Sequence, residues 1–159
     1  MNSAAARSTA ARLARFDDLA GLLELYRELR PRDPVLSVSE LSGHWERMLC
    51  NPDLNVIVAD LAGSLAATCM LAIVANLANG TAPFGVIEHV VTAKAFRRRG
   101  LGRAVLEFAL ELAWSHNCHK VILLSGVQRS EAHALYRSIG FRDDVEQGFV
   151  IKPTRSAGR

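Results

Sequence analysis

The sequence predicts a single domain of the mixed α/β class. Two helical patterns precede three adjacent strand patterns, and helices and strands alternate after them. The chain has 159 residues, and 50% of them are apolar, which is enough for one sizeable core. The composition shows no repeat or linker, so we expect one domain over residues 11–159 after a flexible tail of residues 1–10.

A strand and two helices are expected in the first third of the chain. Alternation over residues 12–15 predicts the strand, and leucines at helical spacing after Asp18 predict the first helix. The segment PRDP at residues 31–34 should end that helix. Ser37 and Glu40 in SVSE have the spacing of a capping box, which predicts the start of the second helix.

The middle of the chain predicts three consecutive strands. Apolar runs cover residues 54–60, 64–77 and 84–92, and Gly-containing turns separate them. Strands joined by short turns pair as antiparallel neighbours. We therefore expect an antiparallel meander.

The last part of the chain alternates again. Helical spacing predicts helices over residues 100–117 and 130–140, with the buried strand KVILLS at 120–125 between them. A short strand pair is expected near Phe141 and at residues 148–152. The complete expected order is β-α-α-β-β-β-α-β-α-β-β.

A cluster of positive charge lies in FRRRGLGRA, residues 96–104. Residues 94–103 carry five basic side chains and no acid, whereas the whole chain has a net charge of +3, so the remainder is net acidic. A helix that begins at such a turn offers unpaired N–H groups to an anion, and glycine allows close approach. A compact phosphate ligand is the functional interpretation, and a solvated turn remains the alternative. The segment lacks the third glycine of a dinucleotide motif and the GK[ST] of a P-loop.

Two segments carry a resemblance to a known family. IEHVVTAKAFRRRGLGRAVLEFALELA resembles the acetyl-CoA-binding motif of the GNAT (GCN5-related) N-acetyltransferases, with Arg97, Gly100 and Gly102 at its signature positions. SEAHALYRSIGF is similar to a later motif of that family. The matching residues there are Ala132, Leu135, Tyr136, Gly140 and Phe141. The resemblance extends over about residues 11–152 and implies the GNAT acyltransferase-like fold.

The resemblance also implies where acetyl-CoA binds. The backbone at Val90 and Val91 would pair with the pantetheine arm. The pyrophosphate would be held by Arg97, Arg98, Arg99, Gly100, Leu101, Gly102, Arg103 and Ala104. Arg129 stands where the family often has an asparagine, so that contact with pantetheine is not carried over.

Two residues are candidates for the chemistry. Tyr136 is a phenol, which can donate a proton to a leaving thiolate, and the tyrosine of similar enzymes does so. Glu88 lies in an otherwise apolar strand, where the resemblance implies a general base or a partner of the acceptor's ammonium. A packed tyrosine and a rim carboxylate in an ion pair are the structural alternatives. Strand alternation is expected to turn His89 away from Glu88, and His133 lies one helical turn before Tyr136.

These observations predict an acetyl-CoA-dependent N-acetyltransferase that acts on a primary amine of a small molecule in a ternary complex. An amino-sugar-phosphate acetyltransferase resembling the glucosamine-phosphate enzymes is the narrower alternative. A non-catalytic acyl-CoA-binding regulatory module is the alternative from another class. Nucleic-acid binding is disfavoured because the arginines lack neighbouring stacking aromatics. We expect no metal.

The cysteines and the hydropathy bear on the cellular setting. The three cysteines are widely spaced and form no CxxC pair, which favours reduced thiols in the cytoplasm. No apolar run approaches the length of a membrane span. A homodimer is expected from the resemblance, without an assigned interface.

Overall fold

The structure is a computed structural model that describes residues 11–153. It divides into two compact units, one ending at Leu123 and the other beginning at Leu124. The expected tail of residues 1–10 lies outside the described residues, and the single domain over residues 11–159 stays a prediction.

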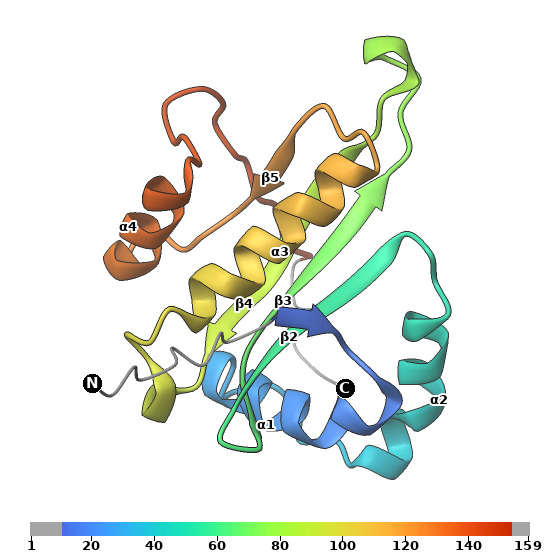
Figure 1. Ribbon diagram of the computed structural model, residues 1–159, viewed down its shortest axis with the longest axis vertical. Helices are drawn as coiled ribbons and strands as arrows, with labels where there is room; N and C mark the ends of the chain where they lie inside the picture. The colour runs from blue at the N-terminus through green and yellow to red at the C-terminus, as the bar shows by residue number, and fades with distance from the viewer. Residues whose placement is uncertain (1–10, 154–159) are drawn as a thin grey trace, which may run out of the picture. The chain divides into compact units, whose positions relative to one another are not determined.

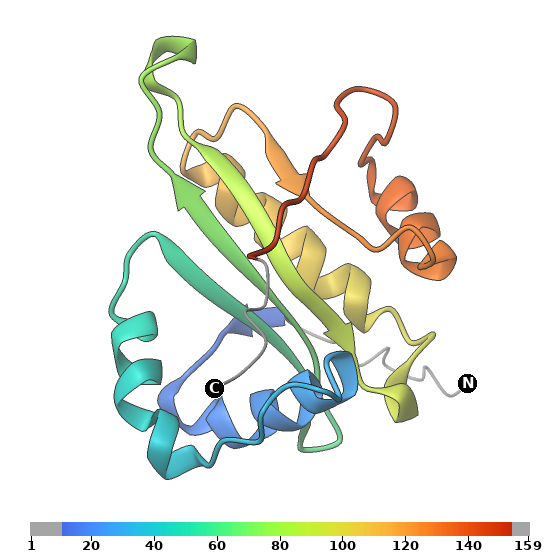
Figure 2. The same ribbon diagram turned by 180° about the vertical axis from the view of Figure 1, so that it is seen from behind.

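The first unit is built on a five-stranded mixed sheet (Figures 1 and 2). Strands β1 to β4 pair antiparallel in sequence order, and β5 joins β4 in parallel. The strands are β1 (Ala11–Leu13), β2 (Leu54–Leu61), β3 (Ser64–Val74), β4 (Phe84–Thr92) and β5 (Val121–Leu123). The predicted meander and the mixed α/β class are confirmed.

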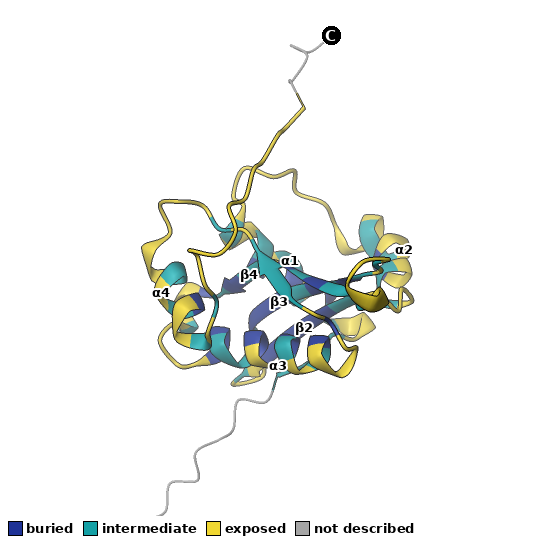
Figure 3. Ribbon diagram, turned by 90° about the horizontal axis from the view of Figure 1, so that it is seen from above, coloured by how far each residue is buried: buried dark blue, intermediate teal, exposed yellow. Residues whose placement is uncertain are grey.

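Helices cover both faces of this sheet (Figure 3). Helices α1 (Leu19–Leu29) and α2 (Val38–Leu49) lie on one face, where they surround a core cluster that includes Val56 and Val58. Helix α3 (Leu101–Ser115) lies on the other face, and Cys69 of β3 donates from Sγ to the Val105 carbonyl of α3 at 3.4 Å. Alternating residues of the central strands therefore enter two different cores.

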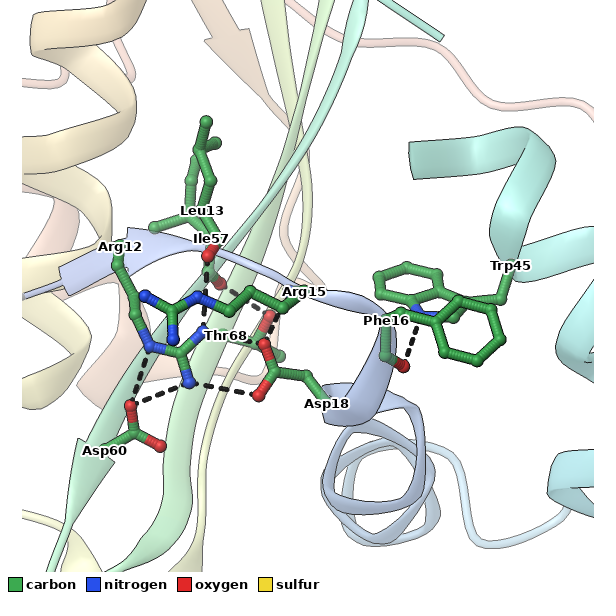
Figure 4. A network of polar contacts seen from close by, with 9 residues as sticks. All are labelled: Arg12, Leu13, Arg15, Phe16, Asp18, Trp45, Ile57, Asp60 and Thr68. Atoms are coloured by element: carbon green, nitrogen blue, oxygen red, sulfur yellow. Dashed lines mark hydrogen bonds and ion pairs between the residues drawn. The ribbon is translucent and has the colours of Figure 1, made fainter. Parts of the chain in front are cut away.

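An ion-pair network fixes the start of α1 against the sheet (Figure 4). Arg12 of β1 donates to Asp18 Oδ2 at 2.7 Å and to Asp60 of β2 at 2.9–3.0 Å. Asp18 ends the short 3-10 helix η1 (Phe16–Asp18) that leads into α1. Hydrogen bonding from Arg12 lowers the pKa of Asp18, so the carboxylate form is the one that the fold stabilises.

The indole of Trp45 connects α2 to η1, next to the Arg12 ion pairs. Its Nε1 donates to the Phe16 carbonyl at 3.0 Å (Figure 4). The ring is buried in the cluster with Leu22 and Val58. A buried indole needs a partner for its N–H, and the exposed carbonyl of η1 supplies one. Trp45 is thus a core residue.

The second unit contains helix α4 (Ser130–Ile139). The helix ends at Gly140, whose φ of 113° lies in the left-handed region, and the Phe141 amide donates to the Tyr136 carbonyl at 3.1 Å. This turn returns the Phe141 ring to the Tyr136 ring, with centroids 6.1 Å apart in an edge-on arrangement. Gly140 and Phe141 of the later motif therefore form the C-terminal end of α4.

The expected strand pair near Phe141 and at residues 148–152 is wrong. The described residues after Ile139 contain no strand, and Val145, Phe149, Val150 and Ile151 are exposed. Instead, Arg137 and Arg142 form exposed ion pairs with Asp143 and Asp144 respectively, and residues 143–145 form a bend. Strand propensity forms a strand only where a partner edge supplies the hydrogen bonds, and the sequence pattern does not contain that information.

Candidate active site

The basic segment lies between β4 and α3. After β4 the chain forms a short 3-10 helix η3 (Lys94–Phe96), and a turn then leads to α3 at Leu101. Arg98 and Gly100 have φ values of 60° and 80°, which place both in the left-handed region. Gly100 is the N-cap of α3, and glycine adopts its conformation without a Cβ penalty. The turn thus leads from the end of β4 into the first turn of α3.

The arginines of this turn are exposed. Among the described residues, Arg97, Arg98 and Arg99 form no ion pair. The Arg99 guanidinium lies 5.9 Å from the Phe96 ring centroid, and Arg97 Nε donates to the Thr92 carbonyl at 3.4 Å. These contacts orient the guanidiniums but do not neutralise them.

Among the described residues, no side chain caps the N-terminus of α3. Gly100 offers no side-chain acceptor, and the first turn carries no acidic residue. Leu101 and Gly102 are buried, so the backbone of this turn is anchored on the core. Arg103 forms an exposed ion pair with Glu107 at 3.2 Å. A rigid helix N-terminus with excess positive charge is suited to an anion.

Strand β4 pairs with β5 over only part of its length before this turn. Its parallel pairing with β5 covers only Gly85 to Ile87, whereas its antiparallel pairing with β3 continues to Thr92. Within the described residues, the edge of β4 beyond Ile87 therefore has no strand partner. Val90 and Val91 lie on this stretch.

A β-bulge interrupts β4 at the same place. Glu88 pairs with Met70 and Val91 pairs with Thr68, so His89 and Val90 together face one residue of β3. Directly paired residues share a face, and Met70 packs in the core cluster beneath α1 and α2. Glu88 is therefore on the α1 and α2 face, where its side chain is exposed.

The expectation that His89 points away from Glu88 is wrong. The His89 ring contacts the Tyr26 ring of α1, with centroids 5.5 Å apart, so it lies on the same face as Glu88. The cause is the left-handed φ of 54° at His89, which changes the alternation that an unbroken strand would keep.

Tyr136 lies in the second unit, on α4, and it is buried. His133 on the same helix donates from Nε2 to the Gly126 carbonyl at 3.1 Å, which is a structural role. Arg129 is the N-cap residue of α4 and is exposed.

The first unit thus brings most of the predicted site residues onto one continuous segment. Glu88, Val90, Val91 and residues 97–104 run from the bulge through the basic turn into α3. Sequence reasoning did not identify Tyr26, whose spacing was that of an ordinary core residue of α1. It also gave no sign of the bulge, because residues 84–92 are uniformly strand-like.

Other kinds of site find no support in the described residues. Over residues 11–153, no group of three or more His, Cys, Asp or Glu side chains could hold a metal ion. In the same range, every helix is too short or too polar to cross a bilayer.

Comparisons with known proteins agree with this geometry. The chain matches the acetyltransferase (GNAT) family over residues 20–141. A solved structure from Agrobacterium tumefaciens, assigned to the acetyltransferases, has a TM-score of 0.86 and 43% identity, over 91% of this chain and 99% of that one.

Two curated relatives are named glucosamine 6-phosphate N-acetyltransferase. The protein from Trypanosoma brucei brucei is 28% identical over 82% of this chain and 86% of its own length. The protein from Arabidopsis thaliana is 30% identical over 70% of this chain and 76% of its own length. The family match includes β4, the basic turn, α3 and the Tyr136 motif. The chain therefore belongs to the GNAT family of N-acetyltransferases.

Proposed function

We propose that this protein transfers the acetyl group of acetyl-CoA to a primary amine of a small molecule, by direct attack in a ternary complex. The observation that carries the proposal is the continuity of the site. Among the described residues, the edge of β4 beyond Ile87 has no strand partner, and the chain continues from it into the basic turn and the N-terminus of α3, which has no side-chain cap. An extended ligand could therefore pair with the β4 edge and place an anionic group at the start of α3.

Acetyl-CoA has two parts that match these two features. Its pantetheine arm carries amides, which can pair with the backbone of Val90 and Val91 on the β4 edge. Its pyrophosphate can accept from the amides of the α3 start, with the side chains of Arg97, Arg98 and Arg99 around it. Together, residues 97–104 form the proposed pyrophosphate site.

The transfer needs a proton acceptor and a proton donor. In the proposal, Glu88 removes a proton from the acceptor's ammonium, directly or through one water, and the neutral amine attacks the thioester carbon. The new C–N bond forms, its nitrogen releases a second proton, and the C–S bond breaks. Tyr136 donates its phenolic proton to the leaving sulfur and regains a proton from solvent.

The test is release of free thiol from acetyl-CoA in the presence of amino sugars, polyamines and peptides. Glu88→Gln should abolish the wild-type pH dependence of turnover. Tyr136→Phe should lower kcat by about 10²-fold or more while coenzyme affinity changes little. Coenzyme binding without turnover on any amine would instead indicate a non-catalytic acyl-CoA-binding module. The presence of both Glu88 and Tyr136 argues against that alternative.

An amino-sugar phosphate is the narrower candidate for the acceptor. Its support is that both curated relatives carry the name glucosamine 6-phosphate N-acetyltransferase over most of this chain. A kcat/KM for glucosamine 6-phosphate at least tenfold above that for glucosamine would support it. Equal values would leave a broader small-amine specificity.

We also propose a cytoplasmic homodimer. The three cysteines are free thiols, which suits a reducing compartment. The second unit exposes Phe149, Val150 and Ile151 as a contiguous apolar stretch, which a second copy could cover. Light scattering should give twice the chain mass, and Phe149→Asp should reduce it toward one chain. An unchanged dimer in that variant would place the interface elsewhere.

A further inference from the structure

His89 has a backbone conformation that is unusual for a strand residue. Its φ of 54° is in the left-handed region, which non-glycine residues adopt at a cost in energy. The bulge at His89 and Val90 is opposite Cys69, whose thiol is bound to α3 through the Val105 carbonyl. Bulges re-aim side chains, and here the re-aimed side chain is an imidazole.

The imidazole is held in place from the α1 side by Tyr26. The Tyr26 hydroxyl hydrogen-bonds with the side chain of Thr68, and Thr68 Oγ1 hydrogen-bonds with the Ile57 carbonyl at 2.7 Å. Burial raises the pKa of Tyr26 to about 12. Tyr26 therefore stays neutral, and its ring packs against the His89 ring.

Other titratable and charged groups lie on or near the elements that contact β4. Burial raises the pKa of Cys69 to about 12, and this thiol points to the α3 face. Arg27 of α1, together with Arg30 and Asp33 just after this helix, lines a cavity of about 170 Å³ that also contacts Tyr26. Glu28 accepts from the Lys94 amide at 2.9 Å. On β4 itself, the neighbouring titratable group is Glu88.

We propose that His89 is a second proton acceptor for the acceptor amine, beside Glu88; this inference rests on the proposed function. An ammonium acceptor loses two protons from nitrogen, one before attack and one as the amide forms. Glu88 takes the first proton and the imidazole of His89 takes the second. The C–S bond breaks, Tyr136 protonates the thiolate, both bases then release their protons to solvent, and Tyr136 regains one proton from solvent.

The test distinguishes the effect of removing the imidazole from the effect of changing the backbone conformation at position 89. His89→Asn retains a residue type that tolerates left-handed φ but removes the proton acceptor, whereas His89→Val introduces a β-branched residue that disfavours the bulge. We expect His89→Asn to lower kcat about tenfold or more, to lose one ionisation from the pH profile of kcat, and to bind coenzyme A within about twofold of wild type. His89→Val should weaken coenzyme A binding as well.

The matched control is His116→Asn, which removes an exposed histidine at the C-terminal end of α3. It should leave both kcat and the pH profile unchanged. A wild-type pH profile in His89→Asn, with active wild-type enzyme, would overturn the role of His89 alone. Absence of turnover in the wild type on all amines would overturn the proposed function itself, which is a distinguishable result.

Discussion

Helices α2 and α3 begin in opposite ways, although both lie against the same sheet. At the start of α2, Ser37 Oγ accepts from the Glu40 amide at 3.3 Å, and Glu40 Oε2 accepts from the Ser37 amide at 2.7 Å. In α3 the equivalent positions are Gly100 and Arg103, and no side chain caps the helix. A side chain therefore caps α2, whereas α3 has no side-chain cap within the described residues.

The difference separates a helix start that serves stability from one that serves binding. A capping box contributes to folding whether or not a ligand is present. An uncapped start surrounded by arginines loses that contribution, and an anion restores it only on binding. Substitutions in α2 should therefore change the free energy of unfolding, whereas those in the α3 turn should change the affinity for coenzyme A.

The largest effect is expected from removing the three arginines of the turn together. Arg97→Ala/Arg98→Ala/Arg99→Ala should raise the Kd for coenzyme A about tenfold to a hundredfold, or about 1.4–2.8 kcal/mol, as measured by titration calorimetry. The Tm without ligand should change little, because these side chains are exposed and form no ion pair among the described residues. Arg47→Ala, at an exposed position of α2, is the control for lost charge. Unchanged affinity in the triple variant would remove the pyrophosphate site.

Arg103 is the N3 residue of α3, and replacing it with glutamate would give α3 the acidic N3 residue that α2 has in Glu40. Arg103→Glu should raise the Kd for coenzyme A about tenfold, because a carboxylate would lie beside the proposed pyrophosphate. Its interaction with the helix dipole should offset both the lost pair with Glu107 and the new repulsion between the carboxylates at positions 103 and 107, so the free energy of unfolding should change by less than about 0.5 kcal/mol. Arg103→Gln should give an intermediate Kd. Equal Kd values in all three proteins would show that the α3 start does not bind the anion.

Removal of the N-cap of α2 should give the opposite result. Ser37→Ala should lower the free energy of unfolding by about 1 kcal/mol in urea titrations, since it removes the acceptor for the Glu40 amide. The Kd for coenzyme A should stay at the wild-type value. A clear loss of affinity would mean that the two helix starts are coupled.

The smallest effect is the pH dependence of the capping box. Hydrogen bonds from the Ser37 hydroxyl and amide lower the pKa of Glu40 in the folded protein. Its contribution to stability is therefore fully present above the unfolded carboxyl pKa of about 4.3 and is lost as pH falls through the lower folded pKa. The Tm difference between wild type and Glu40→Gln should shrink over that interval. A difference that stays constant down to pH 2 would exclude this linkage.

Local patterns accounted for most of what could be predicted. The Ser37 capping box, the break at residues 31–34 and the helical spacing of α1 and α3 depend on neighbours within one or two turns, and the structure has all of them. The basic turn before α3 was also predicted, because charge and glycine content are properties of a short segment. The site roles of Glu88 and Tyr136 remain predictions.

Long-range pairing accounts for what could not be predicted. The exposed stretch with Phe149, Val150 and Ile151 has strand propensity, but the described chain pairs it with nothing. The bulge at His89 exists because β4 pairs with β3 in two registers, one on each side of Cys69. Neither result is encoded in the spacing of apolar residues along one strand.

The amino-acid pattern alone predicted which segments form helices, where α2 and α3 begin, and that positive charge gathers at the α3 start. The fold was needed to show that His89 shares a face with Glu88 and that, among the described residues, the β4 edge has no strand partner beyond Ile87. The two kinds of feature depend on interactions of different range. Caps and helix periodicity act within a few residues, whereas the direction of a strand side chain depends on the register with a strand distant in sequence.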